Sequence, residues 1–416
     1  MEGRAGSGSG ADFWKFWTGQ ALSTLGTAFS TFAIPLLIFQ LTHSPLNLAI
    51  TTFTFTLPHL LFGLVVGAWV DRVDRKRLMI VVDVLLALVI LVIPALALLH
   101  ALNVYWIYGV DFISAALAMV FQQAEFTAIP SLVGERDLVT ANGRISATYQ
   151  ATQVLGPVLA GVIVTLVPVT SLMVADAATY IVSAAALLWI GMSFNRSGST
   201  AGAARERTRV RTDIAEGLRY VWSHPVLRNI SLMMMLFNLV NAPVFAQSVL
   251  YAKDRLHTTN FELGLFFGAG GIGAVLFSLV AGWLRRRMSF SAVVLGCLMA
   301  TGLSLTAFAA IPWFWPAVGL WVLVNGFGSL LNINTFSLRQ AIVPNRLLGR
   351  VLSVAGVLAF SASPLGSLAG GFLIQRTGDV ALVFGGIGIL LFLIPLAFTL
   401  TPLGHADRYL PAEAGG

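Results

Sequence analysis

Residues 67–77 read GAWVDRVDRKR, in which two acidic and four basic residues follow a glycine within one short stretch. The stretch begins at the end of one long apolar segment, 46–70, and leads directly into another, 78–100. The hydrocarbon layer of a bilayer is about 30 Å thick, and about 20 apolar helical residues cross it. The pattern therefore predicts two transmembrane helices joined by a short basic loop.

Apolar segments of this length recur along the whole chain of 416 residues, of which 57% are hydrophobic and only 10% charged. An average soluble domain carries about 25% charged residues, so a water-soluble core is excluded. The runs are continuously apolar, unlike the alternating strands of about ten residues in a membrane barrel. We therefore predict an all-α membrane protein with about twelve transmembrane helices. The predicted helices are 13–40, 46–70, 78–100, 104–127, 143–168, 171–193, 227–250, 262–284, 288–310, 314–337, 349–374 and 380–402.

One long polar segment in the middle of the chain divides these helices into six and six. We expect a flexible tail at 1–12, a six-helix bundle at 13–194, a linker at 195–226, a second six-helix bundle at 227–403 and a tail at 404–416. Within the linker, apolar residues recur at helical spacing at Ile214, Leu218, Val221 and Trp222. This pattern predicts an amphipathic helix at the membrane surface.

The two halves also repeat each other in sequence about half the chain length apart. In the first half, the repeated elements are Ile129-Pro130, Gly143-Arg144 and the stretch 156–161. In the second half, the corresponding elements are Val343-Pro344, Gly349-Arg350 and the stretch 364–370. Parallel repeats related by a pseudo-twofold axis are a common plan of transporters, with the substrate site between them.

The positive charges are strongly biased to one side of the predicted topology. With the N-terminus inside, all of the 25 Lys and Arg residues except Lys253, Arg255 and Arg376 fall in cytoplasmic segments. This bias sets the orientation of membrane proteins, so we expect a multi-pass protein of the inner (plasma) membrane with both termini cytoplasmic. The net charge of +7 is then a topology signal and an attraction to anionic membrane lipids. We expect no nucleic-acid partner.

The stretch 67–77, with Gly, then Asp-Arg, then a basic pair between the second and third helices, resembles the signature loop of the major facilitator superfamily. Other stretches are similar to its macrolide-efflux and enterobactin-exporter branch: LTHSP at 41–45, LP at 57–58, DAATY at 176–180 and IAEGLRY at 214–220. Asp74 stands where many members have Gly. The resemblance covers nearly the whole chain and implies two six-helix bundles and the export of small amphipathic molecules.

Electrostatics predicts a gating role for the signature loop independently of the resemblance. The members of the loop are Gly67, Asp71, Arg72, Asp74, Arg75 and Lys76. The eleventh helix begins near Gly349, and its amino end carries partial positive charge, so Asp71 can hold the two halves together there. Arg72 or Arg75 is a candidate partner for Glu125, which ends the fourth helix on the same side. The alternative is that these charges only set the topology.

Carboxylates at membrane depth cost about 2.5–3.5 kcal/mol on insertion scales, so each is a candidate functional group. Asp83, Asp111, Glu125 and Asp176 all lie in the first half. We take Asp111 as the leading candidate for carrying a proton or contacting a cation, and a pairing role within the bundle is its alternative. We expect Asp83 to serve the cytoplasmic charge network and Asp176 to make structural hydrogen bonds.

Neutral amides are a second set of candidate cavity residues. Each of them can instead form a hydrogen bond between helices, which stabilises the fold by about 0.6 kcal/mol on average. They are Gln20, Gln150, Gln153, Asn238, Asn241, Asn325 and Asn332. Gly156, Pro157 and Gly161 resemble, in reduced form, the antiporter motif of drug exporters. Small residues allow close packing and proline kinks a helix, so these three residues are a candidate hinge.

Several other chemistries are disfavoured. The stretch GAGGIG at 268–273 fits the dinucleotide fingerprint by letter, but it lies inside an apolar segment rather than after a strand. A single cysteine, Cys297, allows no disulfide and no cysteine metal site. We expect no enzyme, no cofactor and no metal, and a monomer that binds a small-molecule substrate and protons. The leading function is proton-coupled export; a lipid or lysolipid transporter and a non-transporting membrane sensor are the alternatives.

Overall fold

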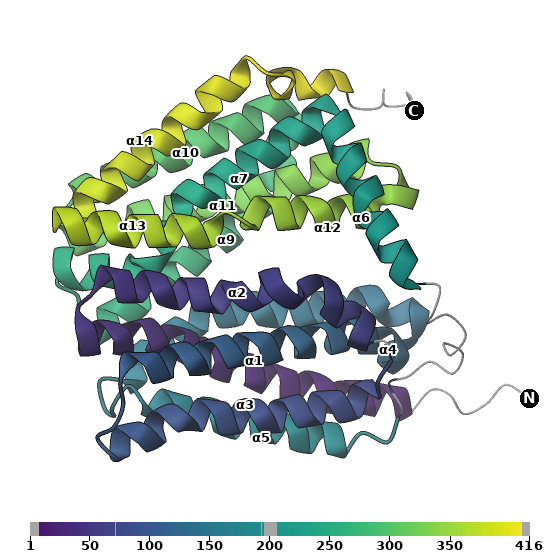
Figure 1. Ribbon diagram of the computed structural model, residues 1–416, viewed down its shortest axis with the longest axis vertical. Coiled ribbons are helices and arrows are strands. Elements are labelled where there is room, and N and C mark those ends of the chain that lie inside the picture. Colours follow the sequence, from purple (N-terminus) through teal and green to yellow (C-terminus); the bar gives the residue numbers. More distant parts are fainter. Residues whose placement is uncertain (1–7, 71, 193, 195–205, 410–416) are drawn as a thin grey trace, which may run out of the picture. The chain divides into compact units, whose positions relative to one another are not determined.

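The computed structural model describes residues 8–70, 72–192, 194 and 206–409 (Figure 1). The chain divides into two compact units. Unit 1 consists of Met1–Ser199 and Thr258–Gly268, and unit 2 consists of Thr200–His257 and Ala269–Gly416. The segment Thr258–Gly268, which we expected in the second bundle, groups with the first. The predicted class is confirmed, because both units are helical throughout and the described residues form no strand.

Unit 1 contains five long helices. They are α1 (Gly8–Thr42), α2 (Pro45–Val70), α3 (Arg75–Leu98), α4 (Val104–Ile163) and α5 (Ser171–Leu188), with the first part of α9 (Asn260–Arg287) added to them. Helix α1 already begins at Gly8, so the end of the predicted flexible tail is helical. Asp74 and Asn103 cap the amino ends of α3 and α4, where polar side chains satisfy free backbone N–H groups.

Helix α4 is 60 residues long and would extend about 90 Å if it were straight. Its contacts show two antiparallel legs instead. In the first leg, Tyr108 donates to Asn47 at the start of α2. In the second leg, Arg144 lies 4.7 Å from the ring of Trp14 at the start of α1, and Gly156 packs further along α1. Pro130 lies between the legs, where it removes a backbone donor.

Eleven helices in the described part of the chain are long and apolar enough to cross a membrane. They correspond to eleven of the twelve predicted segments. The exception is the fifth, 143–168, which becomes the second leg of α4. That leg carries Arg144, Gln150 and Gln153, so it is less apolar than the other segments.

Unit 2 contains the linker helix and the remaining spans. In chain order it holds α6 (Glu206–Ser223), α7 (Pro225–Ala246), α8 (Ser248–Leu250), the π-helix η1 (Tyr251–Arg255), the rest of α9, α10 (Phe290–Ala310), α11 (Phe314–Ile342), α12 (Asn345–Phe360), α13 (Ser363–Thr377), α14 (Val380–Thr399) and the 3₁₀ helix η2 (Pro402–Tyr409). The segment predicted at 349–374 is thus divided into α12 and α13. Part of the predicted tail is ordered, because Asp407 of η2 accepts the N–H groups of Phe290 (2.7 Å) and Ser291 (3.2 Å) at the start of α10.

The two units repeat the same packing. Helix α3 packs against α5 in unit 1, and α10 packs against α14 in unit 2 (Figure 1). Gly156 of α4 touches Ala28 of α1, and Gly366 of α13 touches Leu239 of α7. These two pairs are displaced along the chain by nearly the same number of residues. The sequence echo therefore corresponds to a repeated helix contact.

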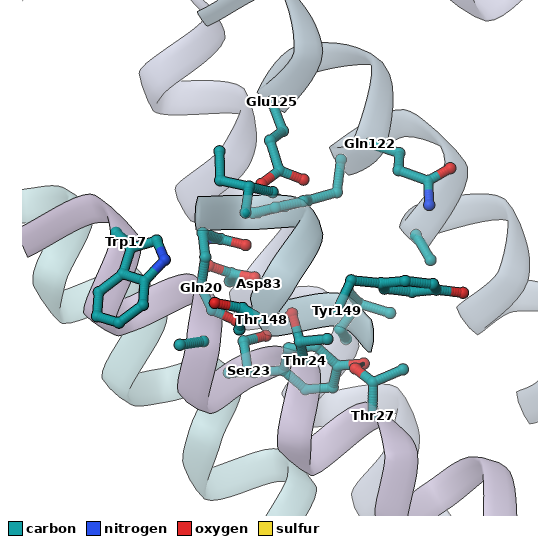
Figure 2. A pocket seen from close by; sticks show the side chains of 16 residues that line it. Trp17, Gln20, Ser23, Thr24, Thr27, Asp83, Gln122, Glu125, Thr148 and Tyr149 are labelled. Atoms are coloured by element: carbon teal, nitrogen blue, oxygen red, sulfur yellow. Dashed lines mark hydrogen bonds between the residues drawn. The ribbon is translucent and has the colours of Figure 1, made fainter. Parts of the chain in front are cut away.

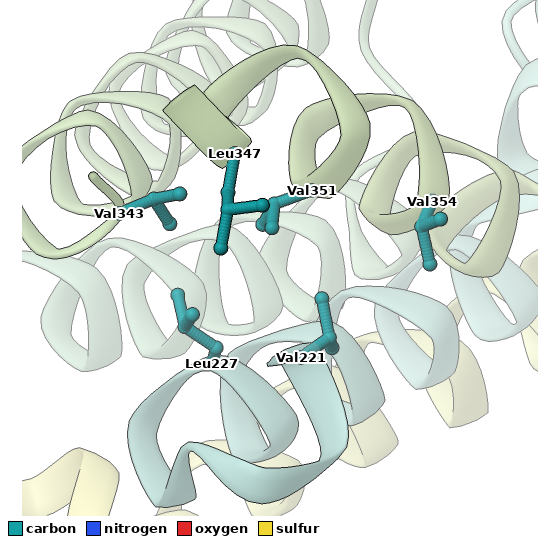
Figure 3. Packing of buried hydrophobic residues seen from close by; sticks show 6 residues of the cluster. All are labelled: Val221, Leu227, Val343, Leu347, Val351 and Val354. Carbon is teal, nitrogen blue, oxygen red and sulfur yellow. The ribbon is translucent and has the colours of Figure 1, made fainter. Parts of the chain in front are cut away.

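The predicted amphipathic helix of the linker is present as α6, and it packs on α12 within unit 2. Buried side chains of α6, α7 and α12, with Val343 at the end of α11, form one apolar cluster, which is Val221, Leu227, Val343, Leu347, Val351 and Val354 (Figure 3). Glu216 forms an ion pair with Arg350 beside this cluster. Leu218 and Trp222 of α6 remain exposed.

Candidate functional site

Unit 1 contains a cavity of about 190 Å³ between α1, α3, α4 and α5 (Figure 2). Its polar side chains come from all four helices. They include Gln20 and Thr27 of α1, Asp83 of α3, Glu125 and Tyr149 of α4, and Tyr180 of α5. Trp17, Leu86 and Phe121 supply apolar wall. The cavity is therefore amphipathic.

Helical periodicity explains why these side chains converge. On α1, Gln20, Ser23, Thr24 and Thr27 recur every three or four residues, so they share one face. Asp83 lies about two turns into α3. Glu125 comes from the first leg of α4 and Tyr149 from the second, so the bend in α4 brings both to the same cavity.

Two carboxylates, Asp83 and Glu125, are the charged groups of the cavity. Asp83 is only 1% exposed, and neither of its oxygens accepts a hydrogen bond from the described residues. Glu125 lies near enough to interact electrostatically with it. None of the described residues that line the cavity is Lys, Arg or His. An unpaired buried charge is costly, so the cavity is suited to bind a proton or a cationic group.

The described part of the basic loop contacts backbone carbonyl groups. Arg75 donates from Nη1 to the carbonyl oxygens of Thr127 (3.3 Å) and Phe194 (3.4 Å), and Lys76 donates to that of Ile190. No ion pair joins Glu125 to Arg72 or Arg75 in the described part of the chain. Arg75 and Lys76 thus donate to backbone carbonyls, two of which lie just beyond α5.

The structure describes one of the two acidic residues of the loop, Asp74, but not the other, Asp71. Asp74 caps α3 by accepting the N–H of Arg77 at 3.0 Å, which explains an acidic residue at this position. Asp71 lies outside the described residues, and for Gly67 only the helical backbone is described. The latch at Asp71 therefore stays a prediction.

The other two embedded carboxylates lie outside the cavity. Asp111 is 5% exposed between α2 and α4, where it accepts a hydrogen bond from Thr54 at 3.3 Å. Asp176 is 1% exposed between α1 and α5, where it accepts a hydrogen bond from Ser30. The structure thus brings Asp83 and Glu125 together but not the leading sequence candidate, Asp111.

The predicted amides also separate into two groups. Gln20 lines the cavity and donates to the Ser183 hydroxyl at 3.1 Å. Gln150 is exposed, and Gln153 donates to the neighbouring Tyr149 hydroxyl at 2.7 Å.

The amides of unit 2 bond mainly to their own helices. Asn238, Asn325 and Asn332 each donate to the carbonyl oxygen four residues earlier. Asn241 keeps a buried side-chain oxygen that has no partner in the described residues. A cavity lining by these amides stays a prediction.

The candidate hinge residues are sites of close helix packing in unit 1. A Cβ at Gly156 would lie 2.5 Å from that of Ala28, and a Cβ at Gly161 would lie 2.9 Å from the Cα of Gly264. The carbonyl oxygen of Pro157 lies beside Gly264 as well. The small residues are thus required by packing, and hinge motion stays a prediction.

Sequence reasoning missed the hydroxyl and aromatic members of the cavity. Thr27, Tyr149 and Tyr180 lie in apolar segments and do not stand out one at a time. The available signal was the spacing of the hydroxyl residues on α1, which places them on the face of Gln20.

The profile of the transmembrane secretion effector family matches residues 9–412. The chain belongs to this family of the major facilitator superfamily. It is 30% identical to the multidrug efflux pump Tap of Mycolicibacterium fortuitum, over 85% of this chain and 87% of the relative. It is 24% identical to macrolide efflux protein A of Streptococcus pyogenes, over 88% of this chain and 90% of the relative.

Solved structures agree on the fold. A bacterial homologue of the iron transporter ferroportin in an inward-facing state aligns with a TM-score of 0.70 at 16% identity, over 94% of this chain and 99% of that one. The nucleoside transporter NupG aligns with a TM-score of 0.72 at 14% identity, over 93% of this chain and 98% of that one. The protein is thus a multi-pass membrane transporter of the efflux branch of the superfamily, as the sequence resemblance predicted.

Proposed function

We propose that this protein is a proton-coupled exporter of small amphipathic molecules that works by alternating access. It lies in the plasma membrane with both termini in the cytoplasm, as the bias of positive charges predicts. Two relatives are named as a multidrug efflux pump and a macrolide efflux protein, which supports drug-like or macrolide-like cargo.

The observation that carries the proposal is the cavity of unit 1 with its two carboxylates. Asp83 and Glu125 share a small, mostly apolar space whose described lining holds no basic side chain. A proton bound at either carboxylate removes part of the uncompensated charge. A carboxylate that gains a proton in one state of the transporter and loses it in the other couples cargo movement to the proton gradient.

The walls of the same cavity suit an amphipathic cargo. Trp17, Phe121 and Tyr149 offer aromatic surface, and Gln20 with the α1 hydroxyl groups offers hydrogen bonds. Pockets that combine apolar walls with a few polar groups are typical small-molecule sites. In this account the cargo contacts the walls while the carboxylates exchange protons.

The gate of the exporter belongs to the same proposal. The contacts of Arg75 and Lys76 fasten the basic loop to the backbone just beyond α5. Asp71 latches the halves together when the site is closed to the cytoplasm, and its release opens that side. Two bundles rocking about a fixed site are the usual means of alternating access.

The test is export from a host strain that lacks its own efflux pumps. Cells that express the protein are loaded with a macrolide, a lipophilic dye cation, a siderophore and a lysolipid, with and without a proton uncoupler. We expect lower accumulation of at least one amphipathic compound, and we expect the uncoupler to abolish this effect.

Matched variants connect the result to the cavity. Asp83→Asn keeps the size of the side chain but cannot bind a proton, so we expect export to fall by about tenfold or more. Asp137→Asn makes the same change at an exposed position of α4 and should leave export unchanged. Unaltered accumulation of every compound would reject export, and wild-type export by Asp83→Asn would reject the role of the cavity.

A further inference from the structure

A row of polar side-chain pairs runs between α1 and α5, along one side of the cavity. Gln20 donates to Ser183 at 3.1 Å, the hydroxyl groups of Thr27 and Tyr180 lie 3.0 Å apart, and Ser30 donates to Asp176. We call these three pairs the α1–α5 seam. Successive members on each helix are three, four or seven residues apart, so they follow one face of that helix.

One end of the seam opens on the carboxylates of the cavity. Gln20, Thr27 and Tyr180 all line the cavity. The Ser183 hydroxyl lies beside the Asp83 carboxylate, although not in the alignment of a hydrogen bond. A proton that enters the cavity therefore meets the seam directly.

The other end of the seam is Asp176, a carboxylate that the site described above does not use. It is 1% exposed, and its Oδ1 has no hydrogen-bond partner in the described residues. Gly26 allows this oxygen to lie close to the backbone of α1, since a Cβ at Gly26 would lie only 2.8 Å from Oδ1. The free oxygen is an unused acceptor deep inside the bundle.

No opposite charge compensates Asp176 among the described groups around the seam. Helix α5 packs against α1 and α3. The hydroxyl groups of Ser30 and Thr179 lie close to Asp176 and interact favourably with its charged form. The titratable groups around the seam are Tyr180 on α5, Asp83 on α3 and Glu125 on α4. All of these titratable groups are acids. A proton is therefore the natural ligand for this end of the seam.

We propose that Asp176 is a second proton-binding site of the exporter, filled from the cavity through the Thr27–Tyr180 pair. The phenol of Tyr180 passes its proton toward Oδ1 of Asp176, and a proton from the cavity replaces it, so that one O–H bond breaks for each one that forms. Tyr180 and Asp176 are four residues, about one helical turn, apart on the same face of α5, and Tyr180 lies near enough to interact electrostatically with the Asp176 carboxylate. The inference rests on the proposed function, because it extends the proton path of the same cavity.

The test observes protonation directly and needs no cargo. Infrared difference spectra are recorded on the purified protein in liposomes of neutral lipid after a rapid drop in pH. The carbonyl stretch of each newly protonated carboxylic acid is followed in time. We expect Asp176→Asn to remove one band that Asp83→Asn leaves in place.

The relay is tested with variants that remove only a hydroxyl group. Thr27→Val and Tyr180→Phe keep the shape of the seam and should slow the appearance of the Asp176 band by about tenfold or more. Thr31→Val is the matched control, because Thr31 lies one turn further along α1, bonds to the carbonyl of Thr27 and is not part of the seam. It should leave the rate unchanged. Size-exclusion profiles confirm that each variant is folded, and if Asp176→Asn fails to fold, the two relay variants decide alone.

Two results would overturn the proposal. The first is an infrared spectrum in which Asp176→Asn removes no band. The second is a wild-type rate in both Thr27→Val and Tyr180→Phe. If the protein still exports its cargo and an uncoupler still abolishes that export, either result rejects Asp176 as a second proton site but leaves the proposed exporter function standing. A protein that shows the Asp176 band but exports nothing rejects the exporter and keeps the second proton site.

Discussion

At the scale of single residues, Asp83 combines deep burial with two oxygens that accept no hydrogen bond from the described residues. Such a group lowers the stability of the fold, but in the proposed exporter it binds the proton. Functional residues often reduce stability in this way. Asparagine has the same shape and no charge. Asp83→Asn should therefore stabilise the protein by about 1–3 kcal/mol at alkaline pH, where the wild type buries an anion, and by less at acid pH. Thermal unfolding in detergent at several pH values measures this, and equal midpoints for the two proteins at alkaline pH would contradict it.

Gly26 is a second residue whose role can be tested alone. A Cβ at this position would lie 2.0 Å from the Thr179 hydroxyl, so Gly26→Ala should force α1 and α5 apart. We expect a loss of about 1–3 kcal/mol, typical of overpacking. Gly109→Ala in α4 is the control, because no atom lies within 4 Å of its added Cβ. It should be neutral or slightly stabilising, since alanine favours helix. Equal midpoints in a thermal melt would contradict the packing at Gly26.

Residue identity alone predicted part of the site. Asp83, Glu125 and Gln20 were among the sequence candidates because charged and amide groups are rare at membrane depth. The sequence could not show that Asp111 faces Thr54 on α2 rather than the cavity. That distinction depends on the rotation of α4 about its axis, which a single apolar helix does not reveal. Thr27 and Tyr180 were missed because each is ordinary in an apolar segment.

At the scale of elements, the linker helix α6 is held to α12 more by apolar packing than by charge. Leu347 is 5% exposed in the apolar cluster that joins α6 and α7 to α12, whereas the Glu216–Arg350 pair is partly exposed. Leu347→Ala should cost about 2–5 kcal/mol, as large-to-small core changes do. Glu216→Gln should cost less than about 1 kcal/mol, because solvent screens exposed ion pairs. Unfolding midpoints of the two variants measure the difference, and the reverse order would contradict this view of α6.

Asp407 of η2 joins this helix to α10 by accepting the free N–H groups at the amino end of α10. Asp407→Ala leaves two backbone N–H groups without this acceptor and should cost about 0.5–2 kcal/mol. Asp407→Asn keeps one acceptor oxygen and should cost less. Limited proteolysis after Thr401 provides the readout, and equal cleavage of Asp407→Ala and wild type would show that the cap does not hold η2.

Elements were predicted well where their pattern was local. The amphipathic spacing in 211–222 predicted α6, and most apolar segments match helices within a few residues. The bend of α4 and the docking of η2 were not predicted. The bend follows from contacts of α4 with α1 and α2, and η2 depends on Asp407, whose partners lie far away in the chain. Such long-range contacts leave no periodic signal.

At the scale of the whole molecule, the two units repeat one packing plan but divide their polar groups unequally. The embedded carboxylates Asp83, Asp111, Glu125 and Asp176 belong to unit 1. The amides of unit 2 bond mainly within their own helices. The proposed exporter therefore carries its protons in unit 1. The sequence repeat and the signature loop were enough to predict the fold and the family, but not which carboxylates share a cavity.

The central claim is that proton movement through unit 1 drives export, and its most direct test is transport in proteoliposomes. Purified protein is reconstituted with a pH-sensitive dye inside, and the cargo found in the cellular panel is added under an imposed proton gradient. The account predicts cargo movement against proton movement, with both lost in Asp83→Asn and retained in Asp137→Asn. Cargo movement at the wild-type rate after the proton gradient has been collapsed, or in Asp83→Asn, would contradict it.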